Sequence, residues 1–251
     1  MNRICISLGL VFVLLGGAVA ATDEPDFVQI LAELDRMANF HGRDFSCIYT
    51  IVSQKPGEDQ SVTQARMFRR DERNQFVLLI MQPEVNRGQG YLQVDDNVWF
   101  YDPESRKFSH SSLRENIEDS EAKNSDLNRS SLSEDYRVTS WTQGILGSYA
   151  VYVIDLAAAH NEVSYERMRI WVRSDITLML KEEDYSVSGR LMRTSFYPNY
   201  TRVGDNYLPN RILIVDELEE GERSQITMRD PSIAALPDSV FSKAYLERVN
   251  N

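Results

Sequence analysis

Apolar residues near the start of the chain recur at the spacing of an α-helix. Within residues 26–40 they lie three or four positions apart, at Phe27, Ile30, Leu31, Leu34 and Met37. Glu24 and Asp26 flank Pro25, and acidic groups there suit the positive end of a helix dipole. The sequence therefore predicts one amphipathic helix whose apolar stripe packs on another element.

From residue 46 onward, short runs rich in β-branched and aromatic residues alternate with turn signals, a pattern typical of β-strands. We expect about eleven strands, at residues 46–52, 63–70, 76–82, 90–94, 98–101, 149–156, 167–172, 178–185, 190–197, 208–215 and 224–228. Short turns between them, such as Asp95-Asp96-Asn97, predict an antiparallel meander. A short helix is expected near residues 239–246.

Residues 109–136 differ from the rest, because they are polar and nearly free of β-branched residues. We expect short helices and loops laid over the sheet, with a disordered linker as the alternative. No internal repeat and no Pro/Gly-rich linker divides the chain. One domain over residues 21–251 is therefore the simplest organisation.

The strand at residues 76–82 contains six consecutive apolar residues, from Phe76 to Met81, so both of its faces should be buried. A curved sheet with helices in its hollow, a closed barrel or a bound apolar ligand would each bury them. Aromatic residues and methionines on successive strands suit an apolar cavity, although ordinary core is the alternative. The candidate cavity residues are Phe68, Phe76, Leu78, Ile80, Tyr91, Trp99, Tyr101, Trp171 and Met179.

Arg69 and Arg70 follow the candidate Phe68 and have two interpretations. They are either surface charge or a latch, in which an arginine at the mouth of the cavity bonds backbone carbonyls of the covering helices. The sequence does not decide between them.

Charge and motif content exclude several classes of function. The chain carries 38 acidic and 27 basic residues, the wrong sign for binding nucleic acid or anionic lipid head groups. Nucleotide-binding, hydrolase-elbow and zinc-protease motifs are missing, and His41, His110 and His160 are far apart in sequence. We expect no enzyme activity, no cofactor and no metal; a lipid hydrolase with residues assembled in space is the weakest alternative.

Residues 1–20 have the layout of a secretory signal peptide, with Arg3, an apolar core over residues 4–15 and small residues up to Ala20. That core is shorter than the roughly 20 residues of a membrane-spanning helix, so we expect cleavage near Ala20 rather than an anchor. Ala21 stands where a lipoprotein would carry its lipidated cysteine. The mature protein is therefore expected in the periplasm, unlipidated.

Cleavage would leave Cys47 as the one cysteine, so no internal disulfide is expected. Its neighbours predict a strand, and a buried, unreactive thiol is the expected state.

Several phrases resemble, in order and spacing, the outer-membrane lipoprotein-sorting proteins, or LolA-like carriers. They are Arg87 to Leu92, Asp96 to Pro103, Arg106-Lys107, Asp119-Ser120, Ser125 to Leu127, Pro237 to Phe241 and Tyr245-Leu246. Acidic residues at 115, 118, 119 and 121 depart from the family pattern.

The resemblance implies a strongly curved antiparallel sheet, an incomplete barrel covered by helices, whose apolar hollow accepts acyl chains. It also implies a carrier that moves acylated lipoprotein or lipid cargo through the periplasm, from an inner-membrane release complex to an outer-membrane acceptor. Because a fold does not determine cargo, a phospholipid or glycolipid carrier and an envelope-stress sensor on the same fold remain alternatives.

Overall fold

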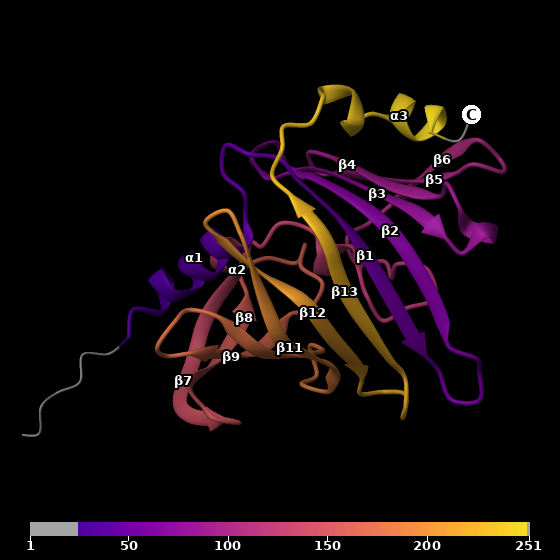
Figure 1. The fold of residues 1–251 in the computed structure, drawn as a ribbon. Coiled ribbons are helices and arrows are strands. Elements are labelled where there is room, and N and C mark those ends of the chain that lie inside the picture. The colour runs from indigo at the N-terminus through magenta and orange to yellow at the C-terminus, as the bar shows by residue number, and fades with distance from the viewer. Residues whose placement is uncertain (1–24, 250–251) are drawn as a thin grey trace, which may run out of the picture.

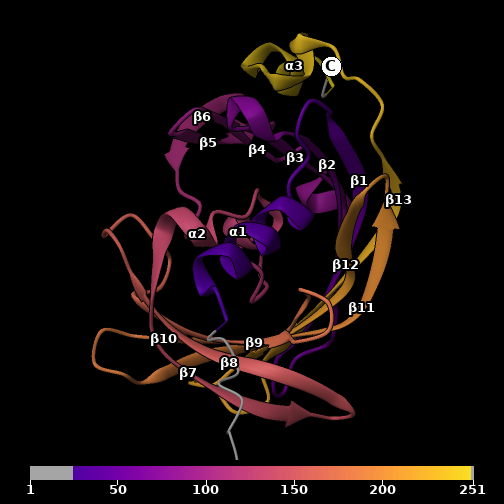
Figure 2. The same cartoon turned by 90° about the vertical axis from the view of Figure 1, so that its left-hand side faces the viewer.

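The computed structural model describes residues 25–249, most of which lie in one antiparallel sheet (Figure 1). Its strands are β1 (Phe45–Gln54), β2 (Ser61–Arg70), β3 (Gln75–Gln82), β4 (Gly90–Val94), β5 (Asn97–Asp102), β6 (Lys107–Ser111), β7 (Tyr136–Leu146), β8 (Tyr149–Ala158), β9 (Arg167–Arg173), β10 (Met179–Tyr185), β11 (Leu191–Val203), β12 (Asn206–Asp216) and β13 (Arg223–Ser232). Their order across the sheet is β6-β5-β4-β3-β2-β1-β13-β12-β11-β10-β9-β8-β7. The sheet curves strongly without closing into a barrel, as the sequence predicted (Figure 2).

This order explains what fills the hollow. The chain builds one wing from β1 to β6 and then restarts at β7, on the opposite edge of the sheet. Residues 112–135, which we call the crossing segment, must therefore pass between the two wings. The segment includes the 3₁₀ turn η3 (Asn124–Leu127) and the single-turn helix α2 (Leu132–Asp135).

Helix α1 (Phe27–Ala38) lies in the hollow beside the crossing segment (Figure 2). Asp26 caps it, because its Oδ1 accepts a hydrogen bond from the Gln29 backbone N–H at 3.0 Å. Phe27, Leu31 and Leu34 are buried, which confirms the predicted apolar stripe.

The main core lies on the concave side of the first wing. Phe76, Leu78 and Ile80 of β3 pack there against side chains of the crossing segment, including the fully buried Ile117 and Leu127. The crossing segment is thus ordered over the sheet, and the disordered-linker alternative is wrong. Its few apolar residues suffice because Ile117, Leu127 and Leu132 are buried and Leu113 is partly buried.

The convex face of β3 is covered by the end of the chain. The 3₁₀ turns η1 (Asp71–Arg73) and η2 (Glu84–Asn86) flank β3, whereas η4 (Asp238–Phe241) and α3 (Lys243–Arg248) lie outside the sheet (Figure 1). Val77 packs in one cluster with Phe241 and Leu246. Both faces of β3 are therefore buried, as predicted, and the C-terminal segment covers the outer one.

The structure has two strands that the sequence pattern did not predict, β6 and β7, and they are the two edges of the sheet. β6 reads Lys-Phe-Ser-His-Ser, and most residues of β7 are exposed or half-buried. Edge strands bury little, so their alternation is weak. The turn predicted at Asp95-Asp96-Asn97 is confirmed but one residue shorter: Val94 of β4 pairs with Asn97 of β5 across a two-residue hairpin turn in which Asp95 has φ 54°.

One further expectation, about Cys47, is tested by its burial. Cys47 is buried on β1, and burial raises the pKa of its thiol to about 12, as expected for an unreactive cysteine. Among residues 25–249, no helix is long and apolar enough to span a membrane. The predicted signal peptide, including its cleavage site, lies outside the described residues.

Candidate functional site

A cavity of about 730 Å³ lies in the hollow, between α1, the crossing segment and the concave face of the second wing, and a few residues of the first wing, such as Arg69, also line it. Ligand sites in proteins commonly have volumes of about 300–1,000 Å³. The concave face of this wing is covered by a short helix and an irregular segment rather than by a second sheet. This covering leaves the cavity open.

One wall of the cavity is apolar. It combines side chains of α1, α2, the neighbouring strands and their loops: Leu34, Met37, Leu132, Val163, Met168, Leu178, Met179, Leu208 and Ile212. Leu34 and Met37 come from the stripe of α1 that packs into the hollow. An alkyl chain placed here would leave water and contact hydrocarbon.

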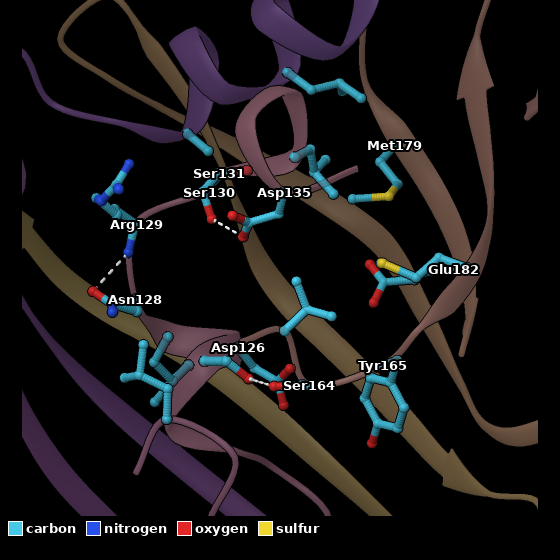
Figure 3. A pocket seen from close by; sticks show the side chains of 18 of the residues that line it. Asp126, Asn128, Arg129, Ser130, Ser131, Asp135, Ser164, Tyr165, Met179 and Glu182 are labelled. Atoms are coloured by element: carbon cyan, nitrogen blue, oxygen red, sulfur yellow. Dashed lines mark hydrogen bonds between the residues drawn. The ribbon is translucent and has the colours of Figure 1, made fainter. Parts of the chain in front are cut away.

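Another part of the lining, which we call the polar wall, is polar and charged. Arg193 of β11 donates from Nε to Asp184 Oδ2 at 2.6 Å, and from Nη1 and Nη2 to the two carboxylate oxygens of Asp126 at 2.8 and 2.7 Å. Glu182 accepts a hydrogen bond from the Tyr197 hydroxyl at 2.9 Å. In Figure 3, Glu182 and Met179 of β10 point toward the open space from one side, and Ser131 and Asp135 lie across from them.

The strand register brings these charges together. Glu182 and Asp184 are two residues apart on β10 and share its concave face, and Asp184 pairs directly with Arg193. Asp126 reaches the same arginine from the crossing segment, so this ion cluster also holds that segment against the sheet.

Burial and the mutual repulsion of acids perturb the cluster. Burial, and then the charge of Asp184, raises the pKa of Glu182 well above its usual value. Burial also raises the pKa of Asp184, against the opposing effect of Arg193. Three carboxyl groups, those of Asp126, Glu182 and Asp184, surround one guanidinium, so the single positive charge of Arg193 cannot balance all three.

The structure distributes the nine candidate cavity residues over several places. Met179 lines the cavity. Phe76, Leu78, Ile80 and Tyr91 lie in the packed core of the first wing.

The other four candidates lie on the convex side. Phe68, Trp99 and Tyr101 pack beneath the C-terminal segment. Trp171 faces outward below Lys181, whose Nζ is 4.4 Å from the centre of the indole ring. Any contact of these eight residues with lipid stays a prediction.

The two candidate latch residues face opposite sides of the sheet. Arg69 is buried, lines the cavity, and donates to Asp71 at 2.8–2.9 Å and to the Ala38 carbonyl, at the end of α1, at 3.3 Å. Arg70 instead donates to Asp44 and to the Leu236 carbonyl, each at 2.7 Å, and so fastens the C-terminal segment. Arg69 has the carbonyl contact expected of a latch, but its function as one stays a prediction.

No pattern in the sequence predicted the charged cluster of the polar wall. Lys181-Glu182-Glu183-Asp184 is an unbroken charged run, so no alternation shows which side chains face inward. Arg193 and Asp126 are distant from it in sequence and meet it through the register of β10 with β11 and the path of the crossing segment. Only the folded arrangement reveals the cluster.

Solved structures resemble this chain over nearly all of its length. A LolA superfamily protein from Nitrosomonas europaea is 26% identical, with a TM-score of 0.76, and the match covers 86% of this chain and 97% of that one. A putative outer membrane lipoprotein-sorting protein domain from Vibrio parahaemolyticus is 20% identical, with a TM-score of 0.77, covering 88% and 98% of the two chains. A DUF1329 family protein from Desulfovibrio piger is 17% identical, with a TM-score of 0.77, covering 87% and 97%.

The curved open sheet and its match to these solved structures show that the chain has a LolA-like fold. A family model described as an uncharacterized protein matches residues 72–248, and the chain belongs to that family. No curated protein matches the chain.

Proposed function

We propose that this protein is a periplasmic carrier that shields acyl chains of lipoproteins, or of other lipids, during transfer towards the outer membrane. The LolA-like fold suggests a lipid or lipoprotein carrier. The observation that carries the proposal is the cavity of about 730 Å³, which has an apolar wall in the hollow of that fold.

The physical need for such a cavity follows from the cost of exposing alkyl chains. Each CH₂ moved from hydrocarbon into water costs about 0.8 kcal/mol, so a chain of about twelve carbons costs roughly 10 kcal/mol. A cavity that buries part of the chain lowers this cost without any covalent step. The proposed carrier is therefore not an enzyme.

The compartment and partners belong to the same proposal. Export with cleavage near Ala20, and an unlipidated start at Ala21, would leave the protein free to move between two membranes. An inner-membrane release complex would load it, and an outer-membrane acceptor would unload it.

Displacement of a neutral fluorescent dye, N-phenyl-1-naphthylamine, tests the proposal. We expect the dye to fluoresce on binding the protein and to be displaced by medium-chain amphiphiles at micromolar concentrations. Met179→Trp places a larger side chain in the cavity and should weaken dye binding by about tenfold or more, equivalent to about 1.4 kcal/mol. The matched control is Met192→Trp, at a half-buried position on β11 that does not line the cavity.

Two results would reject the carrier function. The first is a wild-type protein that binds neither the dye nor any amphiphile. The second is equal weakening by both tryptophan variants, which would place binding outside the cavity.

A further inference from the structure

The polar wall of the cavity offers acceptors to a ligand and almost no free positive charge. Each of the three side-chain nitrogens of Arg193 already donates to a carboxylate oxygen, of Asp184 or Asp126. The guanidinium is therefore engaged in holding the crossing segment to the sheet. An anionic ligand would have to compete with two carboxylates for it.

The other three arginines that line the cavity also donate hydrogen bonds, two of them to carboxylates and the exposed Arg114 to a backbone carbonyl. Arg69 donates to Asp71, Arg114 to the Asn161 carbonyl, and Arg129 to Glu134. Six acidic residues and four arginines line the cavity. Its charge thus favours neutral or positive groups over negative ones.

A second observation points to a missing donor. Asp184 is wholly buried and lines the cavity, yet its Oδ1 accepts no hydrogen bond from the described residues. A buried acceptor without a partner costs about 1–3 kcal/mol. A donor supplied by a ligand would recover part of that free energy.

The apolar wall begins beside Glu182, on the same strand as Asp184. Met179, on the apolar wall, and Glu182 come from the same strand, and both point toward the open space (Figure 3). A ligand with its alkyl chain along the apolar wall would therefore bring its first polar group to Glu182, two residues before the buried Asp184 on β10.

From this arrangement we infer that the cavity selects amphiphiles whose polar group beside the alkyl chain is a neutral or cationic hydrogen-bond donor, such as an amide or an ammonium. Carboxylate and phosphate head groups are disfavoured at this position, because they would be buried against carboxylates without a free cation. The inference rests on the proposed carrier function and specifies the chemistry of its ligand.

Dye displacement by three ligands of equal chain length tests this selectivity: decanamide, decylamine and decanoate, at a pH of about 8. We expect decanamide and decylamine to bind at least about tenfold more tightly than decanoate. Equal or tighter binding of decanoate would overturn the inference.

A pair of matched variants assigns the selectivity to the acidic wall. Glu182→Gln keeps the size of the side chain and can still accept from Tyr197, so it should fold; it should lower the preference for decylamine over decanoate by about threefold or more. Glu162→Gln makes the same chemical change at an exposed lining position and should leave the preference unchanged. An unchanged preference in Glu182→Gln, or an equal change in both variants, would contradict the inference.

The two proposals fail in different ways. If no ligand displaces the dye, the carrier function fails and the selectivity with it. If all three ligands displace the dye equally well, the carrier function stands and the selectivity alone is wrong.

Discussion

At the scale of single residues, Glu121 in the crossing segment is expected to make the stability of the protein depend on pH. Burial, followed by the neighbouring Asp216, raises its pKa from 4.5 to about 7. A carboxyl group with a raised pKa in the folded state stabilises the fold most below its unfolded pKa. That contribution is lost as the pH rises from about 4.5 through about 7.

Glu121→Gln removes this dependence. Relative to the wild type, we expect the variant to gain stability between about pH 5 and about pH 8, because the glutamine never ionises. Urea unfolding midpoints at these two values measure the gain. The exposed Glu104→Gln should show no such trend, and an equal difference at both pH values for Glu121→Gln would refute the assignment.

At the scale of secondary-structure elements, Asp35 joins α1 to α2. Its carboxylate accepts from the backbone N–H groups of Leu132 at 2.9 Å and Ser133 at 2.8 Å, and from the hydroxyls of Ser130 and Ser133. It therefore caps the start of α2 from another helix, and both helices contribute to the cavity.

Asp35→Asn should lower the free energy of unfolding by about 1–3 kcal/mol, because an amide can offer a single acceptor oxygen to four donors. The control Glu33→Gln, on the same helix, breaks a partly exposed ion pair with Arg36 and should cost no more than about 1 kcal/mol. Urea denaturation of the two variants compares them. If both variants lose the same free energy of unfolding, the contacts of Asp35 with α2 stabilise the protein no more than a surface ion pair does.

The contact between α3 and the sheet depends on a glycine. A Cβ atom at Gly90 would lie 2.8 Å from Leu246 Cδ2 and 3.0 Å from the Leu78 carbonyl oxygen. The absence of a side chain on β4 thus lets Leu246 pack directly against the strand.

Gly90→Ala should destabilise the protein by about 1–3 kcal/mol through this overlap. Gly144→Ala on β7 is the matched control, because its Cβ would be 3.4 Å from Val153 Cγ2. We expect a smaller effect there, measured by thermal or urea unfolding. A Gly90→Ala variant as stable as the Gly144→Ala variant would show that α3 moves away at no cost.

How far the elements could be predicted depends on how much each one buries. The interior strands were all predicted, and all but β10 have apolar residues at regular spacing, whereas β6 and β7 were missed because the edge of a sheet buries little. The sequence predicted that both faces of β3 are buried. It did not predict that α3 covers one of them. That contact joins residues as far apart as Val77 and Leu246, 169 positions along the chain, and no local pattern encodes it.

At the scale of the whole molecule, strand order determines where a ligand would bind. The sheet is built from its centre to one edge and then from the other edge back, so the chain between β6 and β7 must cross the hollow. Together with α1 this crossing segment divides the hollow into a packed core on the first wing and a cavity on the second. The sequence predicted a hollow lined by apolar side chains, but most of the lining residues it proposed lie on the first wing. The pattern did not show over which wing the crossing segment would pack and over which a cavity would remain.

The lining of the cavity, which is partly apolar and partly acidic, also affects which ligands the molecule can hold and how its hollow is kept in shape. A purely apolar hollow would hold any alkyl chain, but this one places a buried acidic cluster beside its apolar wall. The same cluster fixes the crossing segment through Arg193 and Asp126, so the wall that would contact a ligand also holds the cavity together.

The most direct test of the carrier function is native mass spectrometry of the wild-type protein and the Met179→Trp variant, each purified from the periplasm without detergent. We predict that the wild type carries an additional mass, which dissociates as an acylated molecule on activation, and that the variant carries much less of it. A wild-type protein without bound acylated molecules, or one whose bound mass is unaffected by Met179→Trp, would contradict the account.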